Sequence, residues 1–180
     1  MKHTLLWLDL EMTGLLPEKD CILQCAVAVT DDQLSVVTQG VEYVISTAPE
    51  ALAHMHHDVL TMHTKSGLLE RIAQSKLSLV HVEDALIAFF NTYCEPQKTL
   101  LCGNSIWVDR TFLRRHMPRL EALFYYRMVD VSTIKELVVR WYPTLTPFPK
   151  KKNHTALADL HESIAELGYY KENIFCNTIL

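Results

Sequence analysis

The segment TLLWLDLEMTGL, residues 4–15, decides the fold expected for this chain. Thr4–Leu10 is apolar at both odd and even positions, which is typical of a central strand covered on both faces of its sheet. Trp7, Asp9 and Glu11 share one face of this strand, because side chains along a strand alternate sides. The side chains of Asp9 and Glu11 are therefore both expected to point into the covered space on one face of the sheet.

Buried acids of this kind need a partner. An unpaired buried carboxylate is costly, so such a group is neutralised by a base, protonated, or bound to a cation. No Lys or Arg lies within residues 4–12. A purely structural role stays open, in which Asp9 and Glu11 lie near a sheet edge and accept hydrogen bonds from backbone N–H groups or water. Oxygen-only ligands suit Mg²⁺ or Mn²⁺ better than zinc, and phosphoryl transfer is the natural use of such a site.

The segments that follow predict an α/β fold with a mixed sheet. Residues 21–30 and 34–46 are rich in Val and Ile and continue as an antiparallel pair across a turn. Helices and short strands then alternate, and Ser105 and Ser132 are the expected N-caps of two helices. The expected helices cover 78–94, 105–117, 132–141 and a segment from 156 onward, and the expected strands between them cover 99–102 and 127–131.

Composition bounds the class of protein. The 180 residues are 49% apolar and 21% charged, which fits one globular domain spanning 1–180. The five cysteines are scattered without a C-x-x-C pair and suggest neither a disulfide framework nor a zinc site. No segment approaches the roughly 20 apolar residues of a membrane span, and we expect a cytoplasmic protein without a membrane partner. The net charge of −4 favours a short nucleic-acid ligand over a long one.

Two further acids differ in how much their position indicates. Asp109 interrupts an apolar helical stripe that includes Ile106, Phe112 and Leu113, so it is a candidate for a buried acid. Asp159 lies on the polar side of the last expected helix. Its position alone indicates a solvated acid.

The histidines cannot be ranked by position alone. His154 and His161 are equally eligible as a catalytic base among the nine histidines of the chain. The cluster at residues 56–58, His-His-Asp, fits a solvated polar stretch better than a metal site, and position alone gives His63 the same interpretation.

Three segments, in order, resemble the exonuclease motifs of the DEDDh nucleases, in the form found in oligoribonucleases. They are DLEMTGL at 9–15, GNSIWVDRTFLRRHMP at 103–118 and HTALADLHESIAEL at 154–167. HTKSGL at 63–68 and YYRMVDVSTIKELVVRWYP at 125–143 are similar to segments particular to oligoribonucleases. The resemblance covers nearly the whole chain. It implies an RNase H-like exonuclease fold, in which helices flank a mixed five-stranded central sheet.

The resemblance also implies an activity. A protein of this family is a 3′→5′ exoribonuclease that degrades short RNA, especially dinucleotides, to nucleoside 5′-monophosphates. Two divalent cations, Mg²⁺ or Mn²⁺, lie roughly 4 Å apart and clamp the scissile phosphate. By this resemblance the metal-binding acids are Asp9, Glu11, Asp109 and Asp159, and the general base is His154. Five residues turn a helix by about 500°, so His154 is expected in the stretch before the helix that carries Asp159.

Substrate contacts come from the same resemblance. Leu15 resembles a residue that wedges between the two terminal bases, and His63 one that stacks on a base. Ser105 is expected near the 5′ phosphate, together with Tyr126 and Arg127 of a partner subunit. An Arg can pair bidentately with a terminal phosphate dianion, which favours short substrates. The contact from a partner implies a homodimer.

Four positions depart from the family pattern, and two other functions compete with the expected one. Trp107 stands where a small or polar residue is usual, Thr155 and Ala158 replace an Arg and an Asp, and Asp58 replaces a Trp. None of the four is an expected metal ligand. The alternatives are a proofreading-type DEDDh exonuclease acting on longer DNA or RNA, and a catalytically silent nucleic-acid-binding module. The acidic net charge disfavours the first, and the presence of all five expected site residues disfavours the second.

Overall fold

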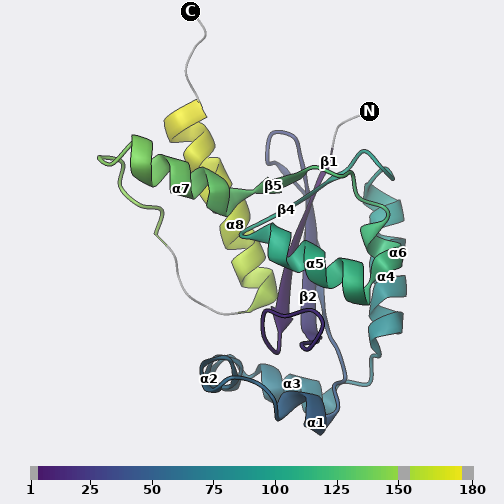
Figure 1. Cartoon of the computed structure of the whole chain (residues 1–180). Coiled ribbons are helices and arrows are strands. Elements are labelled where there is room, and N and C mark those ends of the chain that lie inside the picture. Colours follow the sequence, from purple (N-terminus) through teal and green to yellow (C-terminus); the bar gives the residue numbers. More distant parts are fainter. Residues whose placement is uncertain (1–3, 150–154, 176–180) are drawn as a thin grey trace, which may run out of the picture.

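The computed structural model describes residues 4–149 and 155–175, and its centre is a five-stranded sheet in the order β3-β2-β1-β4-β5 (Figure 1). β1 pairs antiparallel with β2 and parallel with β4, which confirms the predicted mixed sheet. β1 lies in the middle, as its apolar pattern predicted. The strands are β1 (Thr4–Met12), β2 (Ile22–Asp31), β3 (Val36–Val44), β4 (Leu100–Gly103) and β5 (Met128–Asp130).

Four helices flank this sheet where the sequence predicted them. They are α4 (Leu79–Tyr93), α5 (Ile106–His116), α7 (Val131–Trp141) and α8 (Ala156–Tyr170). Five shorter elements had no predicted counterpart. They are α1 (Pro49–Leu52), α2 (His57–Lys65), α3 (Leu68–Gln74), α6 (Pro118–Glu121) and the π-helical turn η1 (Lys171–Phe175). The segment that forms α1 to α3 is polar, and its helices are too short to show a clear apolar period.

Alternation along β1 distributes its side chains between two cores. Leu6, Leu8 and Leu10 belong to the core that contains side chains of α4 and α5. Trp7, on the opposite face, packs with side chains of α7 and α8, and its indole N–H donates to Thr30 Oγ1 at 3.0 Å. The acids that follow Trp7 in the same row are therefore directed toward α8.

One carboxylate holds the start of two helices. The predicted N-cap position of Ser105 is confirmed for α5, whereas the predicted Ser132 cap of α7 was wrong. Ser105 occupies the N-cap position of α5 with φ of 48°, but its hydroxyl donates to Ser132 Oγ and makes no cap bond. α7 is capped by Asp130, whose Oδ1 accepts from Ser132 N at 2.9 Å and also from Ser105 N at 3.0 Å. Asp130 thereby fixes where α5 and α7 leave the sheet.

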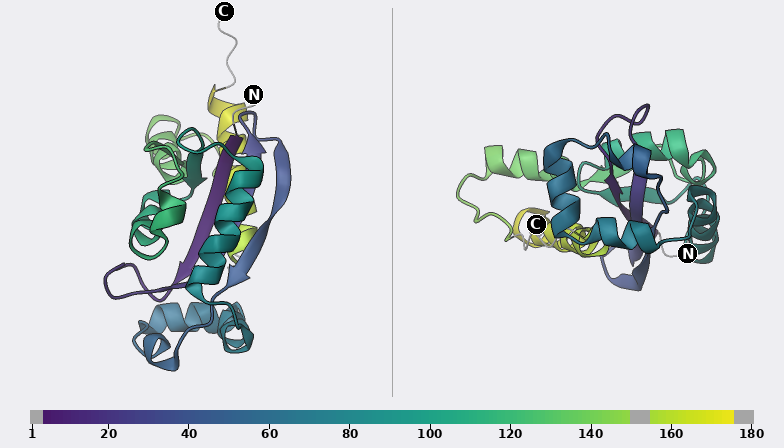
Figure 2. Two further views of the ribbon diagram at one scale, coloured as in Figure 1. Left: turned by 90° about the vertical axis from the view of Figure 1, so that its right-hand side faces the viewer. Right: turned by 90° about the horizontal axis from the view of Figure 1, so that it is seen from below.

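The carboxyl end of β1 is enclosed by segments from distant parts of the sequence. The amino end of α8 lies beside it, and α1, α2 and α3 form a separate layer beyond the same end (Figures 1 and 2). The cysteines of the described part of the chain are free thiols, three of them buried. Within the same residues, no helix combines the length and the apolar character that crossing a membrane requires.

Gly103 allows the close approach of β4, α5 and β1. A Cβ at this position would lie 2.7 Å from the Leu8 carbonyl oxygen and 2.9 Å from Ile106 Cδ1. The first neighbour is backbone and cannot move without shifting β1. Gly168, within α8, is a matched control, because a Cβ there would meet only Leu34 Cδ1 at 3.9 Å.

We predict that Gly103→Ala lowers the free energy of unfolding by about 1–3 kcal/mol, because the added methyl group overpacks this junction. Gly168→Ala should leave stability unchanged or raise it by up to about 1 kcal/mol, since alanine is the better helix former. Urea unfolding followed by circular dichroism measures both. A Gly103→Ala protein as stable as the Gly168→Ala protein would contradict this account of the junction.

Candidate active site

Three carboxylates converge where β1 ends and α8 begins. Asp9 and Glu11 come from β1 and Asp159 from the first turn of α8, and one oxygen of each lies within 4.8 Å of the others. The interpretation of Asp159 as a solvated acid was wrong. Its polar neighbours on the helix, Ser163 and Glu166, are themselves buried, so the polar side of α8 is an interior side.

Asp109 approaches the same point from the other face of the sheet. It lies in the first turn of α5, is 7% exposed, and its Oδ1 accepts from the backbone N–H of Leu10 at 3.0 Å. That N–H lies between Asp9 and Glu11, beyond the last residue of β1 that pairs with β4. Asp109 is not one of the three acids whose oxygens meet within 4.8 Å, but the charge of Glu11 contributes to the raised pKa of Asp109.

Burial and mutual repulsion make negative charge unfavourable here. Burial, with the charge of Asp159 added, raises the pKa of Glu11 to about 7. Burial also raises the pKa of Asp109 to about 7, against the hydrogen bond from Leu10 and with a contribution from Glu11. The pKa of the Cys25 thiol is raised by its burial and then by Asp109 and Asp9. A divalent cation would relieve this repulsion, and the donor set, all oxygen, suits Mg²⁺ or Mn²⁺.

His63 connects α2 to the end of β1. Its side chain is 1% exposed, its Nε2 lies 2.9 Å from the Met12 carbonyl oxygen, and its Nδ1 lies 3.8 Å from Glu11 Oε2. The ring is therefore positioned to orient Glu11 from within the protein.

Leu15 lies in the loop that follows β1, and hydrogen bonds define the shape of this loop. Its side chain is 72% exposed and lines a cavity of about 850 Å³ between this loop and the start of α2. Asp20 holds the loop, accepting hydrogen bonds from Thr13 Oγ1 at 3.0 Å and from Leu16 N at 2.9 Å. The cavity is lined by Thr13, Gly14, Leu15, Leu16, Lys19, Asp20, His54, His56, Asp58 and Val59.

His56 and His161 make hydrogen bonds outside the cluster of acids. His56 accepts from the backbone N–H of Asp58 and thereby caps α2, and neither residue joins a metal-binding group within the described residues. His161 Nε2 lies 2.9 Å from the Gln39 carbonyl oxygen. His154, the expected general base, lies outside the described residues, and so does the run of lysines at 150–152.

Tyr126 and Arg127 lie at the opposite end of the sheet from the acids. Pairing aligns Met128 with Leu101, and Leu101 with Leu6. Glu11 is therefore roughly 16 Å further along β1, at about 3.3 Å per residue. Tyr126 is 64% exposed, and its hydroxyl accepts from Arg127 Nε at 2.8 Å.

One hydrogen-bonded set of polar residues was not predicted from the sequence. Asn104, Ser163 and Glu166 form a buried polar network between the start of α5 and the middle of α8. The only sequence signal for it was the placement of Ser163 and Glu166 on the same side of the helix as Asp159.

Comparison with known proteins gives the family. Residues 6–167 match the RNase_T family model, described as an exonuclease. An oligoribonuclease of Photobacterium profundum is 50% identical over 177 residues, which cover 96% of this chain and 96% of that protein. Those of Vibrio cholerae and Dichelobacter nodosus are 47% identical over 174 residues and 46% identical over 176 residues. These matches cover 96% and 98% of this chain, and 96% and 97% of the respective relatives.

Solved structures share the fold at lower sequence identity. The zinc-bound complex of E. coli ExoI with single-stranded DNA superposes with a TM-score of 0.79 at 17% identity, over 98% of this chain and 42% of that one. A second exonuclease I structure gives a TM-score of 0.73 at 17% identity, over 95% and 41%. This chain thus spans less than half of those chains, and the likeness confirms the predicted RNase H-like exonuclease fold. On sequence and fold together, the chain belongs to the exonuclease family and, within it, to the oligoribonucleases.

Proposed function

We propose that this protein is a metal-dependent 3′→5′ exoribonuclease that hydrolyses short RNA, above all dinucleotides, to nucleoside 5′-monophosphates. The convergence of Asp9, Glu11 and Asp159 within 4.8 Å carries this proposal. The names of the relatives, oligoribonucleases over nearly their whole length, support the choice of RNA. No comparable group of three ligands occurs elsewhere in residues 4–149 and 155–175.

In this proposal the four carboxylates hold two divalent cations, Mg²⁺ or Mn²⁺. Such cations supply Lewis-acid stabilisation of the scissile phosphate and of the attacking water. Asp9, Glu11 and Asp159 contribute oxygens on the α8 side of β1, and Asp109 contributes from the α5 side. His154 precedes α8 by two residues, and as general base it would accept the proton of the attacking water.

The cavity beside Leu15 is the proposed base-binding subsite. Leu15 is exposed at its wall, next to the strand that carries Asp9 and Glu11, and would separate the terminal bases. His63 is buried, so we assign it to holding Glu11 through the 3.8 Å contact instead of to stacking on a base. Ser105 remains a proposed phosphate contact through its hydroxyl.

A homodimer would complete the site. Tyr126 and Arg127 lie near the opposite end of β1 from Glu11, so they cannot serve the acids of their own chain. Tyr126, Met128 and Trp141 are exposed at 64%, 39% and 67%, and a second copy would cover such side chains. We propose that Tyr126 and Arg127 reach the 5′ phosphate bound by the partner.

Removing a site carboxylate should abolish turnover. With 5′-phosphorylated RNAs of two to seven nucleotides and Mg²⁺ or Mn²⁺, we expect Asp9→Ala to lower kcat by at least about 10³-fold, because the cations lose a ligand. Glu136→Gln, an exposed carboxylate of α7, is the control and should retain activity. Dinucleotides should be cleaved fastest, and EDTA should stop the reaction. Faster cleavage of heptanucleotides or of DNA would refute the dinucleotide preference, and turnover in EDTA would refute the metal requirement.

The raised pKa values predict opposite pH trends with and without metal. Unfolding returns Glu11 and Asp109 from about 7 to ordinary values of 4.5 and 3.8, so between these limits the folded state binds more protons. The free energy of unfolding in EDTA should therefore fall as pH rises toward about 7, while Mn²⁺ affinity should increase over the same interval. Glu11→Gln should stabilise the metal-free protein more at pH 8 than at pH 5. Urea unfolding and calorimetry measure these quantities, and an equal effect of Glu11→Gln at both pH values would contradict the prediction.

Mixing two inactive variants tests the partner contact. Asp9→Ala and Arg127→Ala should each be weakly active on dinucleotides. After mixing and subunit exchange, each heterodimer contains one intact site. In that site the Arg127→Ala chain supplies Asp9 and the Asp9→Ala chain supplies Arg127. About a quarter of wild-type activity is expected at equal amounts, since random pairing of two-fold dimers gives half heterodimers. A mixture no more active than its components, or a monomer by light scattering, would exclude a contact from the partner.

A further inference from the structure

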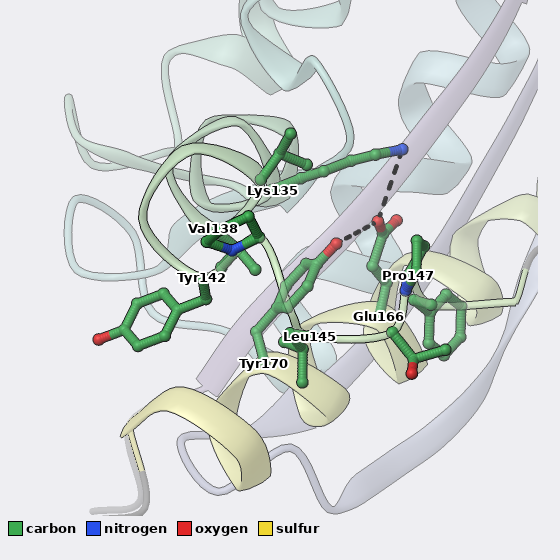
Figure 3. A pocket seen from close by; sticks show the side chains of 11 residues that line it. Lys135, Val138, Tyr142, Leu145, Pro147, Glu166 and Tyr170 are labelled. Atoms are coloured by element: carbon green, nitrogen blue, oxygen red, sulfur yellow. Dashed lines mark hydrogen bonds and ion pairs between the residues drawn. The ribbon is translucent and has the colours of Figure 1, made fainter.

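A buried glutamate side chain lies in α8, away from the cluster of Asp9, Glu11 and Asp159. Glu166 is 0% exposed, although it also lines a cavity of about 370 Å³ between α7, α8 and the segment that joins them. The Tyr170 hydroxyl donates to Glu166 Oε1 at 2.9 Å, and Lys135 Nζ lies 3.8 Å from the same oxygen (Figure 3). Burying a carboxylate costs stability that apolar packing would not, so its presence calls for a role in specificity.

The other oxygen of Glu166 faces the start of α5. Asn104 Nδ2 donates to Glu166 Oε2 at 3.2 Å and to Ser163 Oγ at 2.7 Å. Asn104 Oδ1 accepts from Ser132 Oγ at 3.1 Å, and Ser132 Oγ accepts from Ser105 N at 3.0 Å. One side-chain amide thereby connects β4, α7 and α8.

This network joins the elements that carry the metal-binding acids. Asn104 directly follows β4, and α5 with Asp109 in its first turn begins two residues later. On the side of α8, Ser163 Oγ donates to the carbonyl oxygen of Asp159 at 2.9 Å. The path from Glu166 through Asn104 and Ser163 thus ends on the backbone of Asp159.

We propose that Glu166 is a positioning residue, which with Asn104 fixes the register of α8 against the start of α5 and holds Asp159 at metal-binding distance from Asp9 and Glu11. Hydrophobic burial alone is a weak determinant of the register of α8 against the sheet, because it is non-directional. A hydrogen-bonded carboxylate is directional. A slip of one helical turn, about 5.4 Å, would exceed the 4.8 Å within which the three acids meet.

The test measures Mn²⁺ binding directly, by calorimetry and by the electron paramagnetic resonance signal of free Mn²⁺, on the full-length chain. Glu166→Leu should weaken Mn²⁺ binding at least about tenfold, the effect typical of residues that orient metal ligands. Glu166→Gln, which keeps an acceptor for Asn104, should weaken it less than about threefold. Asn104→Leu should weaken Mn²⁺ binding at least as much as Glu166→Leu, because it also removes the bonds to Ser163 and Ser132. The double variant should be no worse than Asn104→Leu alone, because the bond between Asn104 and Glu166 is then already lost.

Glu83 provides the matched control. It is 5% exposed and accepts hydrogen bonds from Arg119 N and Leu120 N, on α6. Glu83→Leu should destabilise the fold and leave Mn²⁺ affinity unchanged. If Glu166→Leu does not fold, the smaller change Ser163→Ala should still weaken Mn²⁺ binding severalfold.

The outcomes separate this proposal from the proposed function on which it rests. Wild-type Mn²⁺ affinity in the folded Glu166→Leu protein, or in Ser163→Ala, would overturn it. So would an equal loss of affinity in Glu83→Leu, because the effect would then be general loosening of the fold. A wild-type protein that binds Mn²⁺ but cleaves no RNA would refute the exoribonuclease proposal, while the ratios of affinities would still decide the role of Glu166.

Discussion

Repulsion among carboxylates at the end of β1 is the constraint on which the rest of this structure depends. Asp9, Glu11 and Asp159 meet there with Asp109 close by, and burial already opposes the charge of Glu11 and Asp109. β1 holds its two acids in place because it is fixed from both sides, by Leu8 and Leu10 in one core and by Trp7 in the other. Packing in the two cores offsets the repulsion among the carboxylates. Functional sites commonly hold unfavourable groups in this way.

The sequence predicted the parts of this arrangement that depend on local pattern. Period-two alternation was sufficient for Asp9 and Glu11, and an interrupted apolar stripe for Asp109. Asp159 could not be predicted this way, because the helix face that carries it is polar and yet buried against Asn104. Hydrophobicity separates interior from surface only where the interior is apolar.

Other features depended on contacts between distant segments. The cap of α7 was misassigned to Ser132, and Ser105 makes no side-chain cap bond in α5, because Asp130 accepts from the N–H groups of both residues, one of them 25 residues earlier in the chain. The helices α1 to α3 follow from a small core and not from their own periodicity, as expected for short helices stabilised by tertiary packing. The position of Tyr126 relative to Glu11 required the strand register, which no sequence pattern gives. Only resemblance to a family connected these residues beforehand.

The layer formed by α1, α2 and α3 has its own core of Leu23, Met55, Leu68 and Ile72. Side chains at its edge line the cavity beside Leu15, and it contributes none of the four acids proposed to bind metal. In the proposed function, the base would bind beside this layer, and the acids of β1, α5 and α8 would hold the metal ions. His63 of α2 connects the two regions through its contact with Glu11. Because this layer lines the cavity and carries none of these acids, substitutions in it other than at His63 are expected to change substrate preference before they change metal binding.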